Sequence, residues 1–265
     1  MSMKLIQGDC LEVMKALPDN SVDAIITDLP YGTTACKWDV VIPFEPMWAQ
    51  VKRVIKDNGA IVLFGSEPFS SYLRLSNIKD YKYDWIWNKR KAGNIFLAKY
   101  QPMKIHEIIS VFNSKIYYPI KTPRDKIKTS KNYGTGESMG GNKEKEAKVY
   151  LYTDKNPVSI IDVSNASQKG KVHPTQKPVA LMEYLIKTYT NEGDTVLDFC
   201  AGSGTTGVAC RLNKRNFILI EQEEKYCEIA RQRIKNPDYK PPKPKTNQQP
   251  GLFPQDEIDK LTKIK

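Results

Sequence analysis

A glycine-containing peptide at residues 202–207 lies late in the chain and leaves little sequence after it from which to build a fold. It follows the apolar, strand-like residues 195–199, and its small residues let backbone N–H groups approach a bound small molecule closely. One further strand at residues 216–220, one helix at residues 224–234 and a tail come after it. Any sheet that contains this peptide must therefore be completed by residues that precede it.

Residues 3–114 supply the missing strands, because strand-like and helix-like segments alternate there. This alternation favours an α/β fold with a mostly parallel sheet and helices on both faces. Since the strand beside the glycines is written late in the chain, the sequence predicts a circularly permuted Rossmann-like sheet. Strands are expected at residues 4–7, 23–27, 60–65, 83–87 and 107–112, and helices at residues 11–17, 46–56 (ending at Asn58-Gly59), 179–189 and 205–212.

The composition changes between residues 115 and 171, where Lys, Thr, Ser, Asn and Gly dominate and the periodicity fades. We expect a long, polar and weakly structured insertion there. The tail after Lys235 is rich in Pro, Lys and Gln, so it is not expected to fold alone. The chain therefore divides into residues 1–114, 115–172, 173–235 and 236–265.

The formal net charge of +11 implies a negatively charged partner, most commonly a polyanion. No stretch approaches the roughly 18 apolar residues of a membrane span, and Lys4 is not followed by the apolar core of a signal peptide. We therefore expect a soluble, unprocessed, cytoplasmic protein with no membrane partner. The five cysteines form no C-x-x-C pair, and His106 and His173 lie far apart, so neither a disulfide framework nor a metal site is expected.

Residues 202–207 also match the G-x-G-x-x-G dinucleotide fingerprint. Glu221 follows at the end of the next strand, where an acid binds ribose hydroxyls. Taken alone, this match favours an NAD-dependent oxidoreductase. The basic charge also suits a protein that binds nucleic acid and has lost its catalytic site.

A second strand end carries the residues Asp28-Leu29-Pro30-Tyr31, directly after the apolar residues 22–26. This peptide places a carboxylate, backbone carbonyls and an aromatic ring within four residues. Those groups suit an extruded planar base that carries an exocyclic amino group.

The order of the two motifs resembles that of the β-class amino-methylating DNA methyltransferases. In that family an Asp-Pro-Pro-Tyr element precedes a target-recognition insert, and the S-adenosylmethionine-binding element comes last. The resemblance implies that residues 1–114 form the catalytic half, 115–172 the target-recognition insertion and 173–235 the cofactor-binding half. It is carried by Gly8-Asp9, residues 28–31, 173–178, 197–206, and Ile220-Glu221 followed by Tyr226.

The resemblance implies methyl transfer from S-adenosylmethionine to the N6 of a flipped adenine in double-stranded DNA. Cytosine N4 is the alternative target, but those enzymes typically have serine where this chain has Asp28. The Asp28 carboxylate and the Leu29 carbonyl would accept from the amino group while Tyr31 stacks on the base. The implied catalytic residues are Asp28, Leu29, Pro30 and Tyr31, and the implied cofactor-binding residues are Asp9, Asp28, Thr175, Lys177, Asp198, Cys200, Gly202, Gly204, Thr205 and Glu221.

Two positions depart from the family pattern. Leu29 stands where proline is usual, and it keeps the carbonyl but lacks the fixed φ of proline and adds an N–H. We therefore expect an active enzyme with a less rigid loop. Phe199-Cys200 replaces the more common Pro-Phe, and Cys200 is interpreted as a small buried apolar residue rather than a nucleophile.

Three parts of the chain are candidate DNA contacts. Residues 88–94 place cations and amides near phosphates or form a solvated loop. Trp38 and Phe69 either wall the base pocket or belong to the core. The third candidate is the insertion at residues 115–171, with its closely spaced cations Lys115, Lys121, Arg124, Lys126, Lys128 and Lys131.

The function that the resemblance implies belongs to restriction-modification systems, and a second copy of the chain in a homodimer is a possible protein partner. In the tail, Gln249, Leu252 and Phe253 resemble the short peptides by which bacterial DNA-processing proteins hold the replication sliding clamp. We favour the simpler alternative that the Leu-Phe pair packs against this protein's own core.

Overall fold

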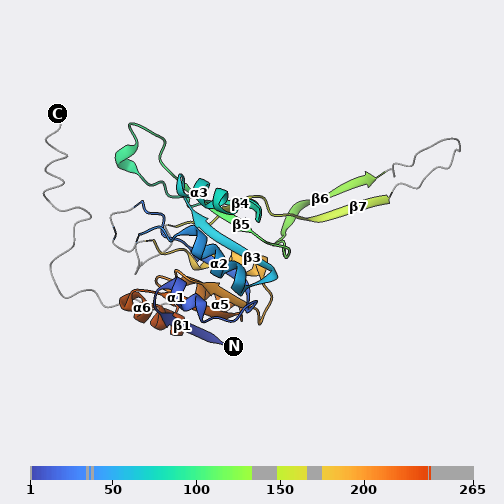
Figure 1. Ribbon diagram of the computed structural model, residues 1–265. Coiled ribbons are helices and arrows are strands. Elements are labelled where there is room, and N and C mark those ends of the chain that lie inside the picture. The colour runs from blue at the N-terminus through green and yellow to red at the C-terminus, as the bar shows by residue number, and fades with distance from the viewer. Residues whose placement is uncertain are drawn as a thin grey trace.

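The computed structural model describes residues 2–33, 36, 39–132, 148–165, 175–237 and 239. Its body is an eight-stranded sheet with the strand order β1-β10-β9-β2-β3-β5-β4-β8 (Figure 1). The strands of this sheet are β1 (Met3–Gln7), β2 (Val22–Asp28), β3 (Ile55–Gly65), β4 (Tyr81–Asn88), β5 (His106–Phe112), β8 (Ile160–Asp162), β9 (Thr195–Asp198) and β10 (Asn216–Glu221).

The permuted arrangement expected from the sequence is confirmed at the centre of the sheet. The late strand β9 pairs in parallel with the early strand β2, with Ala24 opposite Val196 and Ile25 opposite Leu197. On its other side β9 pairs in parallel with β10, which pairs with β1. The two halves of the chain therefore meet at β2 and β9, and their carboxyl ends lie side by side.

Helices cover both faces of the sheet, because successive residues of its central strands point to opposite sides. Ile25 and Ile61 pack on one face, and Ile26 and Val62 pack on the other. All four are fully buried, which stabilises the fold by about 1.5–3 kcal/mol each. One face is covered by α1 (Cys10–Lys15), α2 (Phe44–Val54) and α3 (Phe69–Ser76), and the other by α4 (Val179–Tyr189), α5 (Thr205–Leu212) and α6 (Glu224–Lys235).

The fold differs from the sequence-based expectation in three details, one in the sheet and two in the helices. Strand β5 runs antiparallel to both of its neighbours, β3 and β4. Helix α2 ends at Val54 rather than at Asn58-Gly59, because residues 56–59 form a bulge in β3 opposite Asp23. Helix α3 was not predicted at all.

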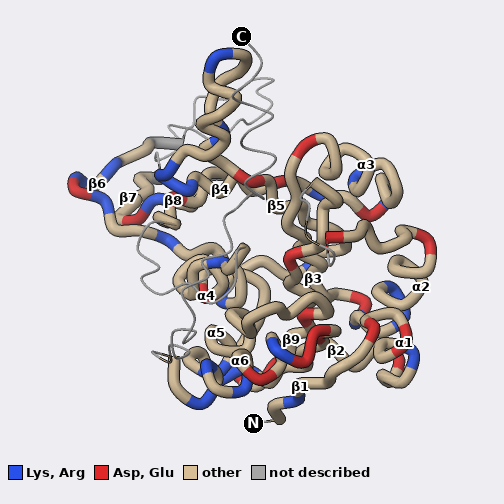
Figure 2. The backbone as a smooth tube through the Cα atoms, turned by 90° about the vertical axis from the view of Figure 1, so that its left-hand side faces the viewer, with Lys and Arg blue, Asp and Glu red and all other residues tan. Residues whose placement is uncertain are grey.

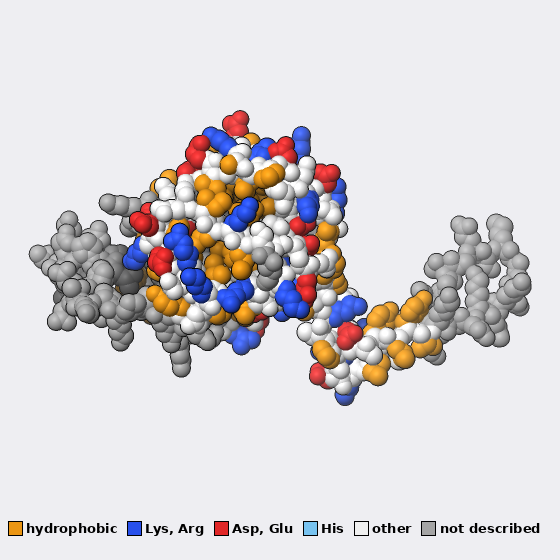
Figure 3. Space-filling view, turned by 90° about the horizontal axis from the view of Figure 1, so that it is seen from below, with side chains coloured by type: hydrophobic (Ala, Val, Ile, Leu, Met, Phe, Trp, Pro, Cys, Tyr) orange, Lys and Arg blue, Asp and Glu red, His pale blue; other side chains and the backbone are white. Residues whose placement is uncertain are grey.

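The insertion is more regular than its composition suggested, so the expectation of weak structure is wrong for three of its segments. Strands β6 (Thr122–Asn132) and β7 (Lys148–Lys155) form an antiparallel hairpin. Strand β8 then returns to the main sheet, where Ile160 pairs with Ile86. The hairpin projects from the body (Figure 1), and apolar side chains including Ile127 and Leu151 lie exposed along it (Figure 3).

Several residues singled out from the sequence lie outside the described residues. They are Trp38, His173 and the tail residues Gln249, Leu252 and Phe253. Among the helices that the structure describes, none is long and apolar enough to cross a membrane.

Candidate active site

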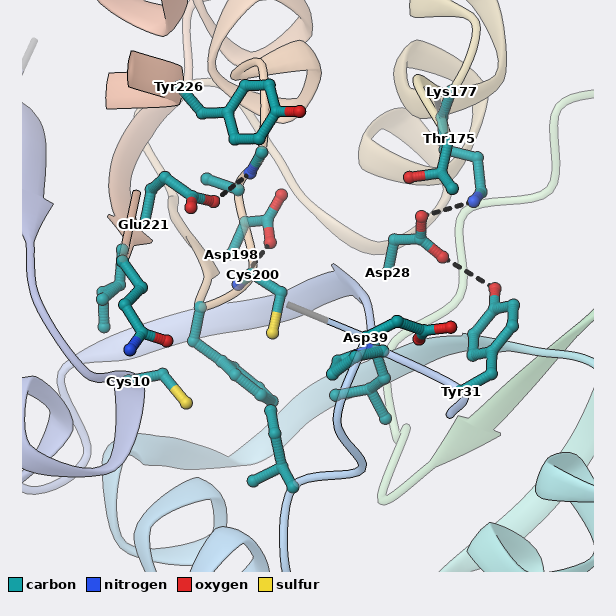
Figure 4. A pocket seen from close by; sticks show the side chains of 18 of the residues that line it. Cys10, Asp28, Tyr31, Asp39, Thr175, Lys177, Asp198, Cys200, Glu221 and Tyr226 are labelled. Atoms are coloured by element: carbon teal, nitrogen blue, oxygen red, sulfur yellow. Dashed lines mark hydrogen bonds and ion pairs between the residues drawn. The ribbon is translucent and has the colours of Figure 1, made fainter. Parts of the chain in front are cut away.

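A cavity of about 660 Å³ opens at the carboxyl ends of β2, β9 and β10 (Figure 4). Ligands of open α/β sheets bind at this edge, and the volume suits a small molecule. Gly204 is absent from the cavity wall, but the other predicted site residues line it. They are Asp9, Asp28, Leu29, Pro30, Tyr31, Thr175, Lys177, Asp198, Cys200, Gly202, Thr205 and Glu221.

Glu221 ends β10 and holds the glycine loop in place at one end of the cavity (Figure 4). Its carboxylate oxygens accept hydrogen bonds from the backbone N–H groups of Gly202, at 2.7 Å, and Glu223, at 2.8 Å. Burial raises the pKa of Glu221, although these backbone donors oppose the rise. Asp9 follows β1, the strand that pairs with β10. It caps α1, because its Oδ1 accepts hydrogen bonds from the N–H groups of Leu11 and Glu12.

Asp198 joins the two halves of the chain beneath the cavity. Its Oδ1 accepts from Thr27 Oγ1 on β2, at 2.7 Å, and from the Cys200 N–H, while its Oδ2 accepts from Thr206 on α5. Burial raises the pKa of Asp198 to about 6. These contacts fix the ends of β2, β9 and α5 relative to one another, and a direct contact of Asp198 with a cofactor stays a prediction.

Gly204 faces away from the cavity and lets α5 approach α6. A Cβ on Gly204 would lie 2.7 Å from the Cβ of Ala230, and its φ of +74° is one that glycine adopts without strain. Nearby, the buried Arg233 donates to both oxygens of Ser203 at 2.7 Å and to the Thr205 hydroxyl at 3.1 Å. The loop that shapes this end of the cavity is therefore held by backbone geometry and by α6.

The other end of the cavity is built around Asp28, the last residue of β2 (Figure 4). Its Oδ1 accepts a hydrogen bond from the Tyr31 hydroxyl at 2.7 Å, and its Oδ2 lies 2.5 Å from Lys177 Nζ. The sequence placed Lys177 near the cofactor, but its ammonium contacts the predicted catalytic carboxylate. A contact between Lys177 and a cofactor stays a prediction.

Glu107, at the start of β5, is a functional candidate that the sequence interpretation missed. Its Oε2 lies 3.4 Å from Lys177 Nζ, and its Oε1 lies 3.3 Å from Lys89 Nζ at the end of β4. Asp28, Lys177, Glu107 and Lys89 therefore form a row of alternating charges with no net charge. The signal available in the sequence was an acid at a strand end, which by itself has no defined partner.

Burial and neighbouring charges set the ionisation of this row. Burial raises the pKa of Asp28, Lys177 opposes the rise, and Glu107 adds to it. Burial alone would lower the pKa of Lys177, but Asp28 and Glu107 outweigh it and raise that pKa. Burial pushes the pKa of Glu107 upward, but Lys177 and Lys89 outweigh it and lower that pKa. The ammonium of Lys177 therefore lowers the pKa of both carboxyl groups and favours their charged forms.

The loop after Asp28 is held by Asp39, a second residue that the sequence interpretation missed. Its two carboxylate oxygens accept from the N–H groups of Gly32 and Thr33, each at 3.0 Å. The ring of Phe69 lies 5.3 Å from that of Tyr31, and Phe69 does not line the cavity. Of the two roles considered for Phe69, the structure supports the second: Phe69 belongs to the core, where it packs behind the ring of Tyr31.

A family model, curated proteins and solved structures all relate this chain to one family. Residues 22–232 match the N6/N4 family described as DNA methylase. Type II methyltransferase M.HpaI of Haemophilus parainfluenzae is 31% identical over 252 residues, which are 88% of this chain and 74% of that protein. Type II methyltransferase M2.MboI of Moraxella bovis is 27% identical over 258 residues, covering 88% and 87%.

Solved structures show the same fold. The complex of M1.HpyAVI with SAM is 27% identical, with a TM-score of 0.58 over 87% of this chain and 99% of that one. The PvuII DNA methyltransferase, described as cytosine-N4-specific, is 16% identical, with a TM-score of 0.64 over 90% and 88%.

Proposed function

This chain belongs to the family of N6/N4 DNA methylases and is an S-adenosylmethionine-dependent DNA methyltransferase, and we propose that its target is the N6 amino group of adenine. The observation that carries the proposal is the Asp28 carboxylate, oriented by Tyr31 and Lys177 at the edge that also carries the glycine loop. Family membership excludes the NAD-dependent oxidoreductase considered from the fingerprint. The intact contacts around Asp28 argue against a decayed site.

The residues of the cavity fit S-adenosylmethionine, which supplies an electrophilic methyl group when bound. Glu221 is the acid for ribose hydroxyls, and the backbone around Gly202 leaves room for close approach. The cavity extends without interruption from Glu221 to Asp28. This continuity supports a nucleoside site and an amino-group site within one pocket.

An exocyclic amino nitrogen is a weak nucleophile because its lone pair is delocalised into the ring. The carboxylate of Asp28 accepts one amino hydrogen and the carbonyl of Leu29 accepts the other, which localises that lone pair. A carboxylate offers about four acceptor positions, so Asp28 retains capacity beside its bonds to Tyr31 and Lys177. The proton that the amino group loses is then held at an Asp28 oxygen.

The choice of adenine rests on Asp28, since serine is typical at this position in cytosine-N4 enzymes. The fold does not distinguish the two targets, because the cytosine-N4-specific PvuII enzyme shares it. The test is to methylate DNA with labelled S-adenosylmethionine, digest it to nucleosides and identify the labelled product by mass spectrometry. N6-methyldeoxyadenosine is expected, and N4-methyldeoxycytidine would contradict the proposal.

The homodimer, the sliding-clamp contact through Gln249, Leu252 and Phe253, and the cytoplasmic location stay predictions. Methylation-sensitive sequencing of DNA from cells that express the protein would identify its recognition site.

Replacing Leu29 with proline is expected to leave kcat/KM within about tenfold of the wild type, because proline keeps the carbonyl that accepts from the amino group. Leu29 packs in the core beside α2, so the variant should lose stability on the order of 2 kcal/mol. Methylation rates and thermal unfolding measure the two effects. An inactive but folded variant would show that the loop follows another path than the mechanism requires.

Replacing Glu221 with alanine is expected to weaken S-adenosylmethionine binding by about tenfold or more, because the acid that orders Gly202 is removed. DNA affinity should change little. Isothermal titration calorimetry measures the cofactor affinity, with Glu224→Ala, an exposed acid in the first turn of α6, as the matched control. Equal affinities for the wild type and Glu221→Ala would remove Glu221 from the cofactor site.

A further inference from the structure

A projecting loop between β4 and β5, residues 89–105, is rooted at the wall of the cavity. We call it the finger. At its base Lys89 lines the cavity, and its N–H donates to the Ile105 carbonyl at 2.9 Å. Further out, Gly93 N–H donates to the Lys104 carbonyl at 2.8 Å. These bonds extend the β4–β5 pair beyond the sheet, so the finger rises from the body as a defined element (Figure 1, upper left).

The tip of the finger is also ordered. It contains a short 3₁₀ turn, η1 (Ile95–Leu97), entered through Asn94 in a left-handed conformation. The N–H groups of Tyr100 and Gln101 both donate to the Leu97 carbonyl, at 2.9 and 3.0 Å. The backbone of the tip is thus fixed by its own hydrogen bonds, and its side chains are presented outward.

Those side chains are apolar and lie in solvent. Phe96 is 84% exposed and Tyr100 is 86% exposed, which is far from the usual state of large aromatic residues. A cluster of exposed apolar side chains on one element marks a surface that binds something. The other exposed apolar residues of the finger are Ile95, Leu97, Met103 and Ile105.

The charge of the finger indicates which kind of partner this surface fits. Residues 88–106 contain five Lys and Arg residues and no Asp or Glu (Figure 2). Three of them are engaged, since Lys89 pairs with Glu107, Arg90 with Asp162, and Lys104 contacts Ser66. Lys91 and Lys99 form no ion pair with any residue that the structure describes. Exposed aromatic rings between exposed cations suit a nucleic acid, whose bases stack and whose phosphates carry the charge.

The finger is also better placed than the β6–β7 hairpin to meet DNA at the cavity. The chain reaches the hairpin at the opposite edge of the sheet, where Lys115 N–H donates to Asn58 and Tyr118 N–H donates to Thr188 at the end of α4. Figure 1 shows the hairpin and the finger leaving the body on opposite sides. Of these two described cationic elements, the finger is therefore the one next to Asp28.

We propose that the finger inserts its tip into duplex DNA beside the target base, with Phe96 and Tyr100 occupying the space that the flipped base leaves. This inference rests on the proposed function, because it presumes that a base enters the cavity. Extruding a base costs free energy for lost pairing and stacking, and inserted apolar side chains offset that cost. Lys91 and Lys99 contact the phosphates on either side of the opening.

The test compares the double variant Phe96→Ala/Tyr100→Ala with the wild type on two duplexes that contain the recognition site identified by sequencing. One duplex is fully paired, and the other has an abasic site opposite the target base, so that no base pair has to be broken. The variant should lose about tenfold or more in kcat/KM on the paired duplex, and much less on the abasic duplex. The matched control is Ile78→Ala/Leu212→Ala, which removes two exposed apolar side chains that lie outside the finger.

The charged residues are tested by the salt dependence of DNA binding. Lys91→Ala/Lys99→Ala should weaken DNA binding. The negative slope of log K against log salt concentration should become less steep by about one for each lysine removed. An unchanged slope would overturn their contact with phosphates.

Two results would overturn the insertion of the finger. One is an equal loss for the Phe96→Ala/Tyr100→Ala variant on the paired and abasic duplexes. The other is a dimeric wild type and a monomeric Phe96→Ala/Tyr100→Ala variant in sedimentation velocity, because the tip would then bind a second copy of this chain. Continued methylation of the abasic duplex by these variants would show that the proposed function holds even where the finger proposal fails.

Discussion

Replacing Asp28 with alanine is expected to lower the rate of methyl transfer on the order of 10²-fold or more while S-adenosylmethionine binding stays nearly intact. The carboxylate faces the amino-group end of the cavity, and its two oxygens are oriented by Tyr31 and Lys177. Its loss removes a preorganised acceptor that water cannot replace in the same geometry. Incorporation of labelled methyl groups into DNA measures the rate, and calorimetry measures the cofactor affinity.

The matched control is Asp23→Ala at the other end of the same strand, where Asp23 pairs with Lys56 at 2.5 Å. That change removes the ion pair and a hydrogen bond from the Thr195 N–H, but neither Asp23 nor Thr195 lines the cavity, so the enzyme should remain active. Should Asp28→Ala keep more than about a tenth of the wild-type rate, Asp28 would not be the acceptor.

Replacing Lys177 with methionine is expected to inactivate the enzyme at neutral pH and to move the acid limb of its pH profile upward. Burial and Glu107 both raise the pKa of Asp28, and Lys177 is the group that opposes them. Without that ammonium, the pKa of Asp28 rises further. A protonated carboxyl is a weaker acceptor and has no place for the proton that the amino group loses, so the rate should fall on the order of 10²-fold. Activity should return as the pH is raised and the carboxylate ionises again.

The opposite charge change should move the profile in the opposite direction. Glu107→Gln removes a negative charge that raises the pKa of Asp28, so the acid limb of kcat/KM should shift to lower pH. The control is Lys187→Met, an exposed lysine on α4 that lies outside the cavity. If both Lys177→Met and Glu107→Gln lower the rate without moving the limb, the row of charges has a structural role alone.

The central strands and the two motifs of this fold were predicted well because each is a short segment that can be recognised from adjacent residues. The apolar runs of β2, β3, β9 and β10 are buried on both faces, which is the condition under which a strand reads as a continuous apolar segment. Residues 28–31 and Gly202 belong to linear motifs, and each motif sits at the end of such a strand. Their meeting in one cavity follows from the pairing of β2 with β9.

The residues that the sequence did not reveal take their meaning from distant partners. Glu107 became a candidate only when Lys177, 70 positions later in the chain, was found beside it. The direction of β5 could not be predicted, because an apolar run reads the same for a parallel and an antiparallel strand. In the hairpin, frequent Lys and Thr residues masked strands that pair with each other rather than with the core.

The contact between Thr27 and Asp198 joins residues that are 171 positions apart, so the centre of the sheet closes late during synthesis on the ribosome. Until β9 emerges, β2 has one unpaired edge, which exposes the nascent chain to aggregation and slows its folding. The late synthesis of β9 also delays the assembly of the proposed active site. A chain that ends before Lys177 carries Asp28 but lacks both Lys177 and the glycine loop, so it cannot form the proposed active site.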